Sequence, residues 1–161
     1  MPDTVIMMSN TQEVANLTGQ SCKADGWYGH TEGLHTIVMN VINFTGRIFI
    51  EASLAMTPTD DDWFELDLSH HGFHSHHDDQ DCGCDHSHNH GNYIQFPRNP
   101  NVPTGSQETG GDTGSFGFTF RINALWLRAR LDRTYLDPAL YDLDPNSLQA
   151  LGYVNKITLA R

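Results

Sequence analysis

The clearest pattern in the chain is a period of two that runs from Arg47 to Met56. One face of this stretch carries Ile48, Ile50, Ala52, Leu54 and Met56, and the other carries Arg47, Phe49, Glu51 and Ser53. A period of two over ten residues predicts a half-buried β-strand. Residues 35–43 precede it, are apolar on both faces and predict another strand. The short turn at Thr45 and Gly46 then predicts that the two strands form a hairpin.

Further strands are expected in the second half of the chain. Phe116, Phe118, Phe120 and Ile122 share one face, and the apolar positions then change phase and continue at Leu125, Leu127, Ala129 and Leu131. One extra residue near Asn123 would explain the change, so a β-bulge is predicted there. Short strands are expected at 63–68 and 93–96. A last strand, 153–160, would keep Tyr153, Asn155, Ile157 and Leu159 in phase, after a helical turn near Leu148 that Gly152 ends.

Seven or eight short strands separated by turn residues predict an all-β fold, an antiparallel β-sandwich that resembles a jelly roll. The 161 residues fit one domain, 1–161, with a His/Cys-rich insertion loop at 69–92 and an irregular loop at 97–114. Glycines and three prolines interrupt the second loop, which shows no periodicity.

The charge balance narrows the function classes. Nine basic residues stand against twenty acidic ones, a net charge of −11, which argues against binding to a nucleic-acid backbone. No apolar run approaches the roughly 20 residues of a membrane span, and no secretion signal opens the chain. Three cysteines is an odd number, and a Cys-x-Cys disulfide at Cys82 and Cys84 would be strained, so synthesis in a reducing cytoplasm is expected.

Residues 70–90 concentrate the metal-ligating side chains of the chain. Imidazole, thiolate and carboxylate are the groups that bind zinc, iron or nickel, and a core has no use for such a composition. The candidate ligands are His70, His71, His74, His76, His77, Cys82, Cys84, His86, His88 and His90. A structural transition metal is predicted, with zinc favoured. Six imidazoles from a trimer could instead hold iron or nickel, and a solvated loop that binds metal only as a purification tag does is the competing interpretation.

Other candidate groups favour structural roles. Asp60, Asp61 and Asp62 lack the spacing of a calcium loop and are expected in a solvated turn. His30 and His35 are interpreted as a polar pair at a strand end. Cys22 is expected to be a lone free thiol, and Trp63, Phe64 and Trp126 are expected in the core.

No arrangement of residues marks a catalytic nucleophile, so the chain is not expected to be an enzyme. A cupin-type metalloenzyme would need His and Glu side chains spread over strands. A carbohydrate-binding jelly roll, with Trp27 and Tyr28 as the stacking aromatics, stays open.

Several strand and turn motifs resemble a known family. They are Trp27-Tyr28-Gly29, Gly33-Leu34-His35-Thr36, Asn43-Phe44-Thr45-Gly46, Asp62-Trp63-Phe64, Trp126-Leu127-Arg128 and Val154-Asn155-Lys156-Ile157. Together they are similar to small virion structural proteins of tailed phages, especially of marine cyanophages, over roughly residues 25–66 and 115–161.

The resemblance implies a β-sandwich module on the particle, first of all a capsid decoration (cement) protein, alternatively a neck, tail or fibre component. It implies coat or tail proteins as partners and a virion location after synthesis in the bacterial host. It offers no catalytic residues and does not extend to residues 70–90. Because particles place copies around symmetry axes, a homo-oligomer such as a trimer is expected.

Overall fold

The computed structural model describes residues 4–12, 14–68, 92–97, 111–136 and 145–161. The strands are β1 Thr4–Ser9, β2 Asn16–Thr18, β3 Cys22–Lys23, β4 Leu34–Phe44, β5 Gly46–Ser53, β6 Trp63–Glu65, β7 Ile94–Phe96, β8 Asp112–Arg121, β9 Trp126–Asp132 and β10 Tyr153–Ala160. Two 3-10 turns, η1 Asp25–Tyr28 and η2 Asp60–Asp62, and one helix, α1 Pro145–Ala150, complete the described elements.

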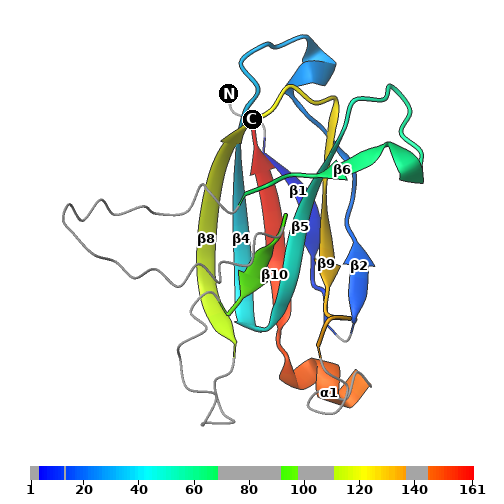
Figure 1. The fold of residues 1–161 in the computed structure, drawn as a ribbon. Coiled ribbons are helices and arrows are strands. Elements are labelled where there is room, and N and C mark those ends of the chain that lie inside the picture. The colour runs from blue at the N-terminus through cyan, green and yellow to red at the C-terminus, as the bar shows by residue number, and fades with distance from the viewer. Residues whose placement is uncertain (1–3, 13, 69–91, 98–110, 137–144) are drawn as a thin grey trace, which may run out of the picture.

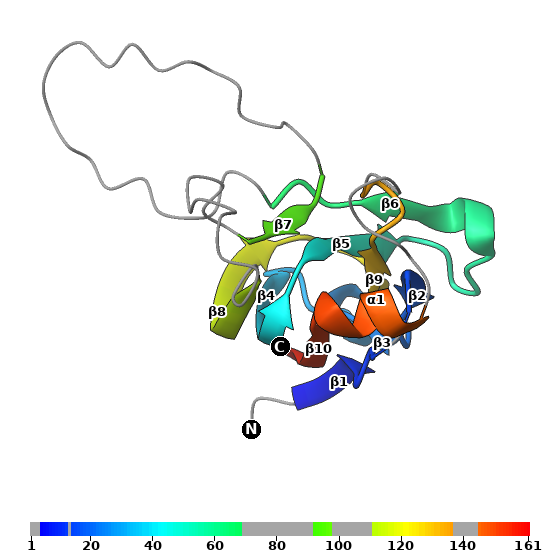
Figure 2. The ribbon, with the colours of Figure 1, turned by 90° about the horizontal axis from the view of Figure 1, so that it is seen from below.

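The strands form two antiparallel sheets that face each other (Figure 1). Sheet A has the order β1-β10-β4-β8, and sheet B has the order β2-β9-β5-β6, with β3 on β9 and β7 on β5. Seen from below, the two layers lie one above the other and α1 covers one open end (Figure 2). The predicted all-β sandwich is therefore confirmed, while the jelly-roll arrangement stays a prediction.

The core lies between the sheets and follows the alternation of the strands. Sheet A contributes the inward side chains of β4, β8 and β10, and sheet B those of β5 and β9. Fully enclosed members include Ile37, Met39, Val41, Ile48, Ala52, Leu127, Ala129, Leu131, Ile157 and Leu159. Burial of these aliphatic side chains is the main favourable term that holds the layers together.

The hairpin predicted around Thr45 and Gly46 is wrong. β4 pairs with β10 and β8, whereas β5 pairs with β6, β7 and β9, so the chain crosses from one sheet to the other at this turn. Phe44 and Ile48 both point into the core on either side of the crossing. A hydrophobic pattern reports which face is buried, but it does not report which strand is the neighbour.

The β-bulge predicted near Asn123 is wrong for a similar reason. β8 belongs to sheet A and β9 to sheet B, and the change of phase between them marks a second crossing between the layers. A bulge does occur in the last strand, where the register with β4 shifts between Val154 and Lys156. This shift is the reason that Val154, Ile157 and Leu159 are buried while Asn155 is exposed. The prediction that Tyr153 and Asn155 are in phase with Ile157 and Leu159 is therefore wrong.

The period of two predicted from Arg47 holds only as far as Ser53. Leu54 and Met56 follow the end of β5 and are 62% and 67% exposed, so they do not extend the apolar face. At the other end of the sandwich, α1 is the predicted helical turn, and Gly152 follows it with a φ of 65°. No helix within the described residues is long and apolar enough to cross a membrane.

Candidate interaction surfaces

The outward side of β1, β10, β4 and β8 forms a surface that we call the outer face of sheet A. Because His35, Ile37, Met39 and Val41 point inward, the intervening residues of β4 point outward. Leu34, Val38 and Ile42 are 44%, 39% and 36% exposed, and Ile6 on β1 is 49% exposed. These four residues are half of the large hydrophobic side chains that are exposed in the described part of the chain. The outer face of sheet A is thus an apolar surface open to solvent.

The polar side chains of this face bond to one another. Thr36 and Thr119 share a hydroxyl hydrogen bond of 3.0 Å. Asn155 donates its amide to Asn40 at 2.8 Å, and Asn40 donates to the Ser115 hydroxyl at 2.9 Å, which links β10, β4 and β8. Because these polar groups are already hydrogen-bonded to one another, a partner protein can cover the surface at a smaller cost in free energy.

The same face has no acidic side chain between Leu34 and Ile42 or between Thr113 and Arg121, in a chain with twenty acidic residues. The charged residues that flank it are Arg121 and Asp112 at the two ends of β8 and Lys156 on β10. Depletion of charge is the compositional mark of the core of a protein interface. This combination makes the outer face of sheet A the strongest candidate interaction surface among the described residues.

A second exposed apolar group lies on the segment between β5 and β6, residues 54–62, which with β6 projects from the sandwich (Figure 1). We call this segment with β6 the arm. Leu54, Met56 and Phe64 are its exposed hydrophobic residues. Its tip is η2, where Thr59 donates its backbone N–H and its hydroxyl to Asp62 at 2.6 Å and 2.7 Å. These hydrogen bonds lower the pKa of the Asp62 carboxyl, and the aspartates of η2 are exposed, as a solvated turn requires.

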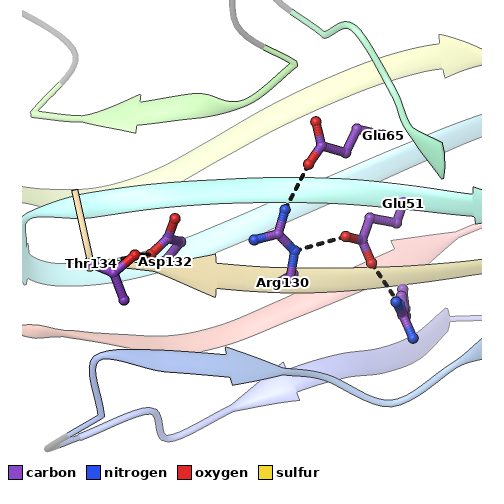
Figure 3. Close-up of polar contacts among 6 residues, drawn as sticks. Glu51, Glu65, Arg130, Asp132 and Thr134 are labelled. Carbon is purple, nitrogen blue, oxygen red and sulfur yellow. Dashed lines mark hydrogen bonds and ion pairs between the residues drawn. The ribbon is translucent and has the colours of Figure 1, made fainter. Parts of the chain in front are cut away.

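The outward side of sheet B carries an ion-pair network instead. Glu51 is 6% exposed and accepts from Arg128 Nε at 2.6 Å and from Arg130 Nε at 2.7 Å, and Arg130 also donates to Glu65 at 2.7 Å (Figure 3). Just after the end of β9, Thr134 donates its backbone N–H and its hydroxyl to the Asp132 carboxylate (Figure 3). Both oxygens of Glu51 are therefore engaged by guanidinium groups, and the network serves to cover the sheet.

Aromatic rings complete this cover. The Arg47 guanidinium lies 3.7 Å from the ring centre of Tyr135 and 4.3 Å from that of Tyr93. Arg128 lies over Trp63 at 4.1 Å. Trp63 is only partly buried and lies outside the core, and Phe64 is 43% exposed. The prediction that both are core residues is therefore wrong. Cation–π contacts of this kind let aromatic rings shield a charged sheet face.

Trp126 and the two aromatics proposed for sugar stacking meet at one end of the sandwich. Trp27 packs against Trp126 with ring centres 4.8 Å apart, and Lys23 Nζ lies 4.1 Å from the Trp27 ring centre. Tyr28 is 50% exposed, but the Arg161 guanidinium lies 4.5 Å from its ring centre. Trp126 is only partly buried, so the prediction that it is a core residue is wrong. A sugar ring would have to displace one of these side chains in order to stack on Trp27.

His35 is fully buried beneath the loop of η1. Its Nδ1 bonds to the Gly33 carbonyl at 2.8 Å, and its Nε2 accepts the Asp25 backbone N–H at 3.2 Å. Burial lowers the pKa of His35, although the hydrogen bond to Gly33 acts in the opposite direction. The ring is therefore a neutral structural group, and both nitrogens are satisfied. Cys22 is a buried free thiol, as predicted, and burial raises its pKa, which leaves it unreactive.

Arg133 is a buried charge that the sequence analysis did not single out. It has no solvent exposure and donates to the carbonyl oxygens of Val14, Thr45, Leu151 and Gly152 at 2.5–3.2 Å. Burial lowers its pKa to about 10, so it stays charged at neutral pH. It ties the crossing between β4 and β5 to the end of α1. Nothing in the sequence distinguishes it from the arginines at 128 and 130.

The ten predicted metal ligands in 70–90, most of the predicted loop 69–92 and residues 98–110 of the predicted loop 97–114 lie outside the described residues. Residues 112–114, which the prediction placed in the second loop, belong instead to β8, so the predicted end of that loop is wrong. Within the residues that are described, no group of three or more His, Cys, Asp or Glu side chains is arranged to hold a metal ion. The metal prediction therefore stays a prediction.

The comparisons with known proteins do not assign the chain to a family. No protein-family model matches the chain, and no curated protein or solved structure is significantly similar to it.

Proposed function

We propose that this chain is a structural component of a tailed-phage particle, first of all a capsid decoration protein that binds neighbouring coat subunits. The observation that carries the proposal is the outer face of sheet A, which is apolar and free of acidic side chains in a chain of net charge −11. The resemblance of the strand and turn motifs to small virion proteins supports the same assignment. The role proposed is assembly and involves no catalysis.

Binding would use the two exposed apolar surfaces. Completing the burial of a side chain such as Val38 contributes about 1–2 kcal/mol. The arm offers a second contact through Leu54 and Met56, and its acidic tip favours a partner surface with basic residues. Each contact is modest, but copies joined in the expected homo-oligomer would bind the particle with avidity. The same surfaces would serve a neck, tail or fibre component, which is the alternative within the proposal.

Residues 70–90 would add a structural metal to this module. Cys82 and Cys84 with His86 and His88 offer a zinc set, and imidazoles contributed by several copies offer an iron or nickel set. A metal bound within one copy would stabilise the folded protein by mass action, and a metal shared between copies would also hold the expected homo-oligomer together.

The direct test locates the protein on a particle. Antibody raised against the purified protein would be applied with a gold label to tailed-phage particles from the source of the sequence. Label over the capsid is expected, and label at the neck or tail would select the alternative. Particles that remain unlabelled, from a lysate in which the free protein is detected, would contradict both.

Substitutions then test whether the outer face of sheet A is the surface that binds the particle. Val38→Asp should reduce recovery of the protein on particles about tenfold, because a desolvated carboxylate would oppose the contact. Thr31→Asp, in the exposed loop that precedes β4 and outside the strands of sheet A, is the matched control and should be recovered as the wild type is. Equal recovery of both variants would remove the outer face of sheet A from the proposal.

A further inference from the structure

β8 is the longest edge strand among those described. It has ten residues and pairs with β4 on one side, and no described strand pairs with its other side. The remaining edges are shorter: β2, β6 and β7 have three residues, β3 has two, and β1 has six with a register shift after Ile6. β8 also has a register shift with β4, but only at its start, and its pairing is regular from Gly114 to Arg121. Natural edge strands are commonly protected by Pro, Lys or a bulge. Residues 113–120 contain neither a proline nor any charged residue.

The unpaired side of β8 can be assigned to particular residues. Ile122 donates its backbone N–H to the Gly33 carbonyl at 2.9 Å, in continuation of the register in which Leu34 faces Arg121. Because backbone groups alternate between the two sides of an antiparallel strand, Ser115, Gly117 and Thr119 direct their N–H and C=O groups away from β4. These three residues form a row of donors and acceptors at the edge.

Gly117 lies at the centre of this row, and the fold of one copy does not require a glycine there. A Cβ added to Gly117 would meet no atom within 4 Å, and its φ is not in the left-handed region. A glycine inside a strand costs about 0.5–1 kcal/mol relative to alanine. Glycine in such a position often marks a place where another backbone approaches closely.

We propose that β8 pairs antiparallel with β8 of a second copy, on a two-fold axis at Gly117. The four-stranded sheet A of each copy would then join that of the other copy in one continuous sheet. In this register Gly117 faces Gly117 of the second copy, and Ser115 faces Thr119. Phe116 faces Phe118 on the core side. Hydroxyl pairs and aromatic pairs are favourable cross-strand neighbours. The strand is therefore complementary to itself, which is the requirement for an isologous contact.

Charge supports a second copy as the occupant. Two chains of net charge −11 repel each other, and they can meet most easily where acidic side chains are absent. Between Thr113 and Arg121 the only charged side chain is Arg121, and the proposed register places it opposite Thr113 of the second copy. The inference is independent of the role on a phage particle, and a trimer built through other residues is compatible with it.

The test uses Gly117→Cys in the full chain with Cys82→Ser and Cys84→Ser, so that the introduced thiol is the only added route to a disulfide. Facing residues in an antiparallel pair have Cα atoms about 5 Å apart, which a disulfide can span. Mild oxidation should give a covalent dimer on a non-reducing gel. Thr119→Cys in the same background is the control, because its two thiols would lie about 13 Å apart along the strands and should not react.

Two measurements on the wild-type chain complete the test. Sedimentation velocity should show an even-numbered species whose fraction rises with concentration. Hydrogen exchange at Ser115, Gly117 and Thr119 should slow over the same concentration range, whereas these amides exchange freely in a monomer. Fast exchange at all concentrations, or equal cross-linking of the two cysteine variants, would overturn the proposed pairing. A folded Gly117→Cys variant, checked by its unfolding transition, excludes misfolding as the cause of a negative result.

Discussion

Arg133 shows how one residue can organise an end of the sandwich. Four backbone carbonyls from three segments converge on its guanidinium, and no carboxylate is among its described hydrogen-bond partners. Two of these carbonyls, those of Leu151 and Gly152, follow α1, where the helix dipole favours a positive charge. The planar guanidinium suits this role because it presents five donors in fixed directions, which a lysine does not.

Arg133→Met should destabilise the protein by about 3 kcal/mol, because it leaves several buried carbonyl groups without a donor. Urea unfolding followed by tryptophan fluorescence measures the loss. Arg121→Met is the control, since Arg121 is exposed, and it should change the free energy of unfolding by less than about 0.5 kcal/mol. Equal effects of the two substitutions would mean that the carbonyls find water or other donors once Arg133 is gone.

His35 should make stability depend on pH. Its pKa is lowered in the folded state, so the unfolded chain binds a proton more readily, and stability falls as pH drops below the unfolded value of about 6.5 toward the folded pKa. Protonated Nε2 would also face the Asp25 N–H as a second donor. The wild-type chain should therefore exceed His35→Gln in free energy of unfolding at pH 7.5, by a margin that narrows at pH 5. A constant margin would show that His35 does not titrate in this range.

At the level of elements, the sequence predicted strands better than it predicted their neighbours. The strand at 46–53 was predicted because one buried face imposes a period of two, and the strand at 153–160 was predicted although its bulge breaks that period. The hairpin at Gly46 and the bulge at Asn123 were wrong, since a change of sheet leaves the same local pattern as a turn or an extra residue. Strand neighbours depend on contacts between segments far apart in the chain, which local periodicity does not contain.

The candidate surfaces were visible in the sequence to different degrees. The sequence has apolar residues on both faces of 35–43, and the structure exposes Val38 and Ile42 among them. Gly117 and Arg133 carried no signal, because their meaning depends on what lies around them in space. Leu54 and Met56 were assigned to the buried face, since periodicity alone does not show where a strand ends.

The network on sheet B offers a prediction at the scale of paired strands. Glu51→Ala should cost about 2 kcal/mol, because it leaves Arg128 and Arg130 without their shared carboxylate on a partly covered face. Glu65→Ala removes the same atoms from a side chain that is 36% exposed and makes one ion pair to Arg130, so it should cost below about 1 kcal/mol. Chemical unfolding of both variants gives the comparison. Equal losses in the free energy of unfolding would mean that the cation–π contacts, and not the ion pairs of Glu51, stabilise this face.

For the whole molecule, charge is distributed unevenly over the two sheets. The outer side of sheet B pairs its charges internally, whereas the described outer face of sheet A has no acidic side chain between Leu34 and Ile42 or between Thr113 and Arg121. A protein that only needed to remain dispersed would gain from acidic residues on both sides. The asymmetry is the reason that both proposals, particle binding and pairing at β8, involve sheet A.

The metal prediction also belongs to the whole molecule, because its stoichiometry reports assembly. Tag-free protein purified without added metal should carry zinc, iron or nickel in native mass spectrometry and elemental analysis. Cys82→Ala, Cys84→Ala, His86→Ala and His88→Ala together should abolish it, whereas His30→Ala should not. The ligands must be deprotonated, so metal should be lost as pH falls below about 6. One ion per chain would indicate a site within one copy, and one ion per three chains a site on a symmetry axis. Wild-type protein without metal would reduce residues 70–90 to a solvated loop and leave assembly to sheet A.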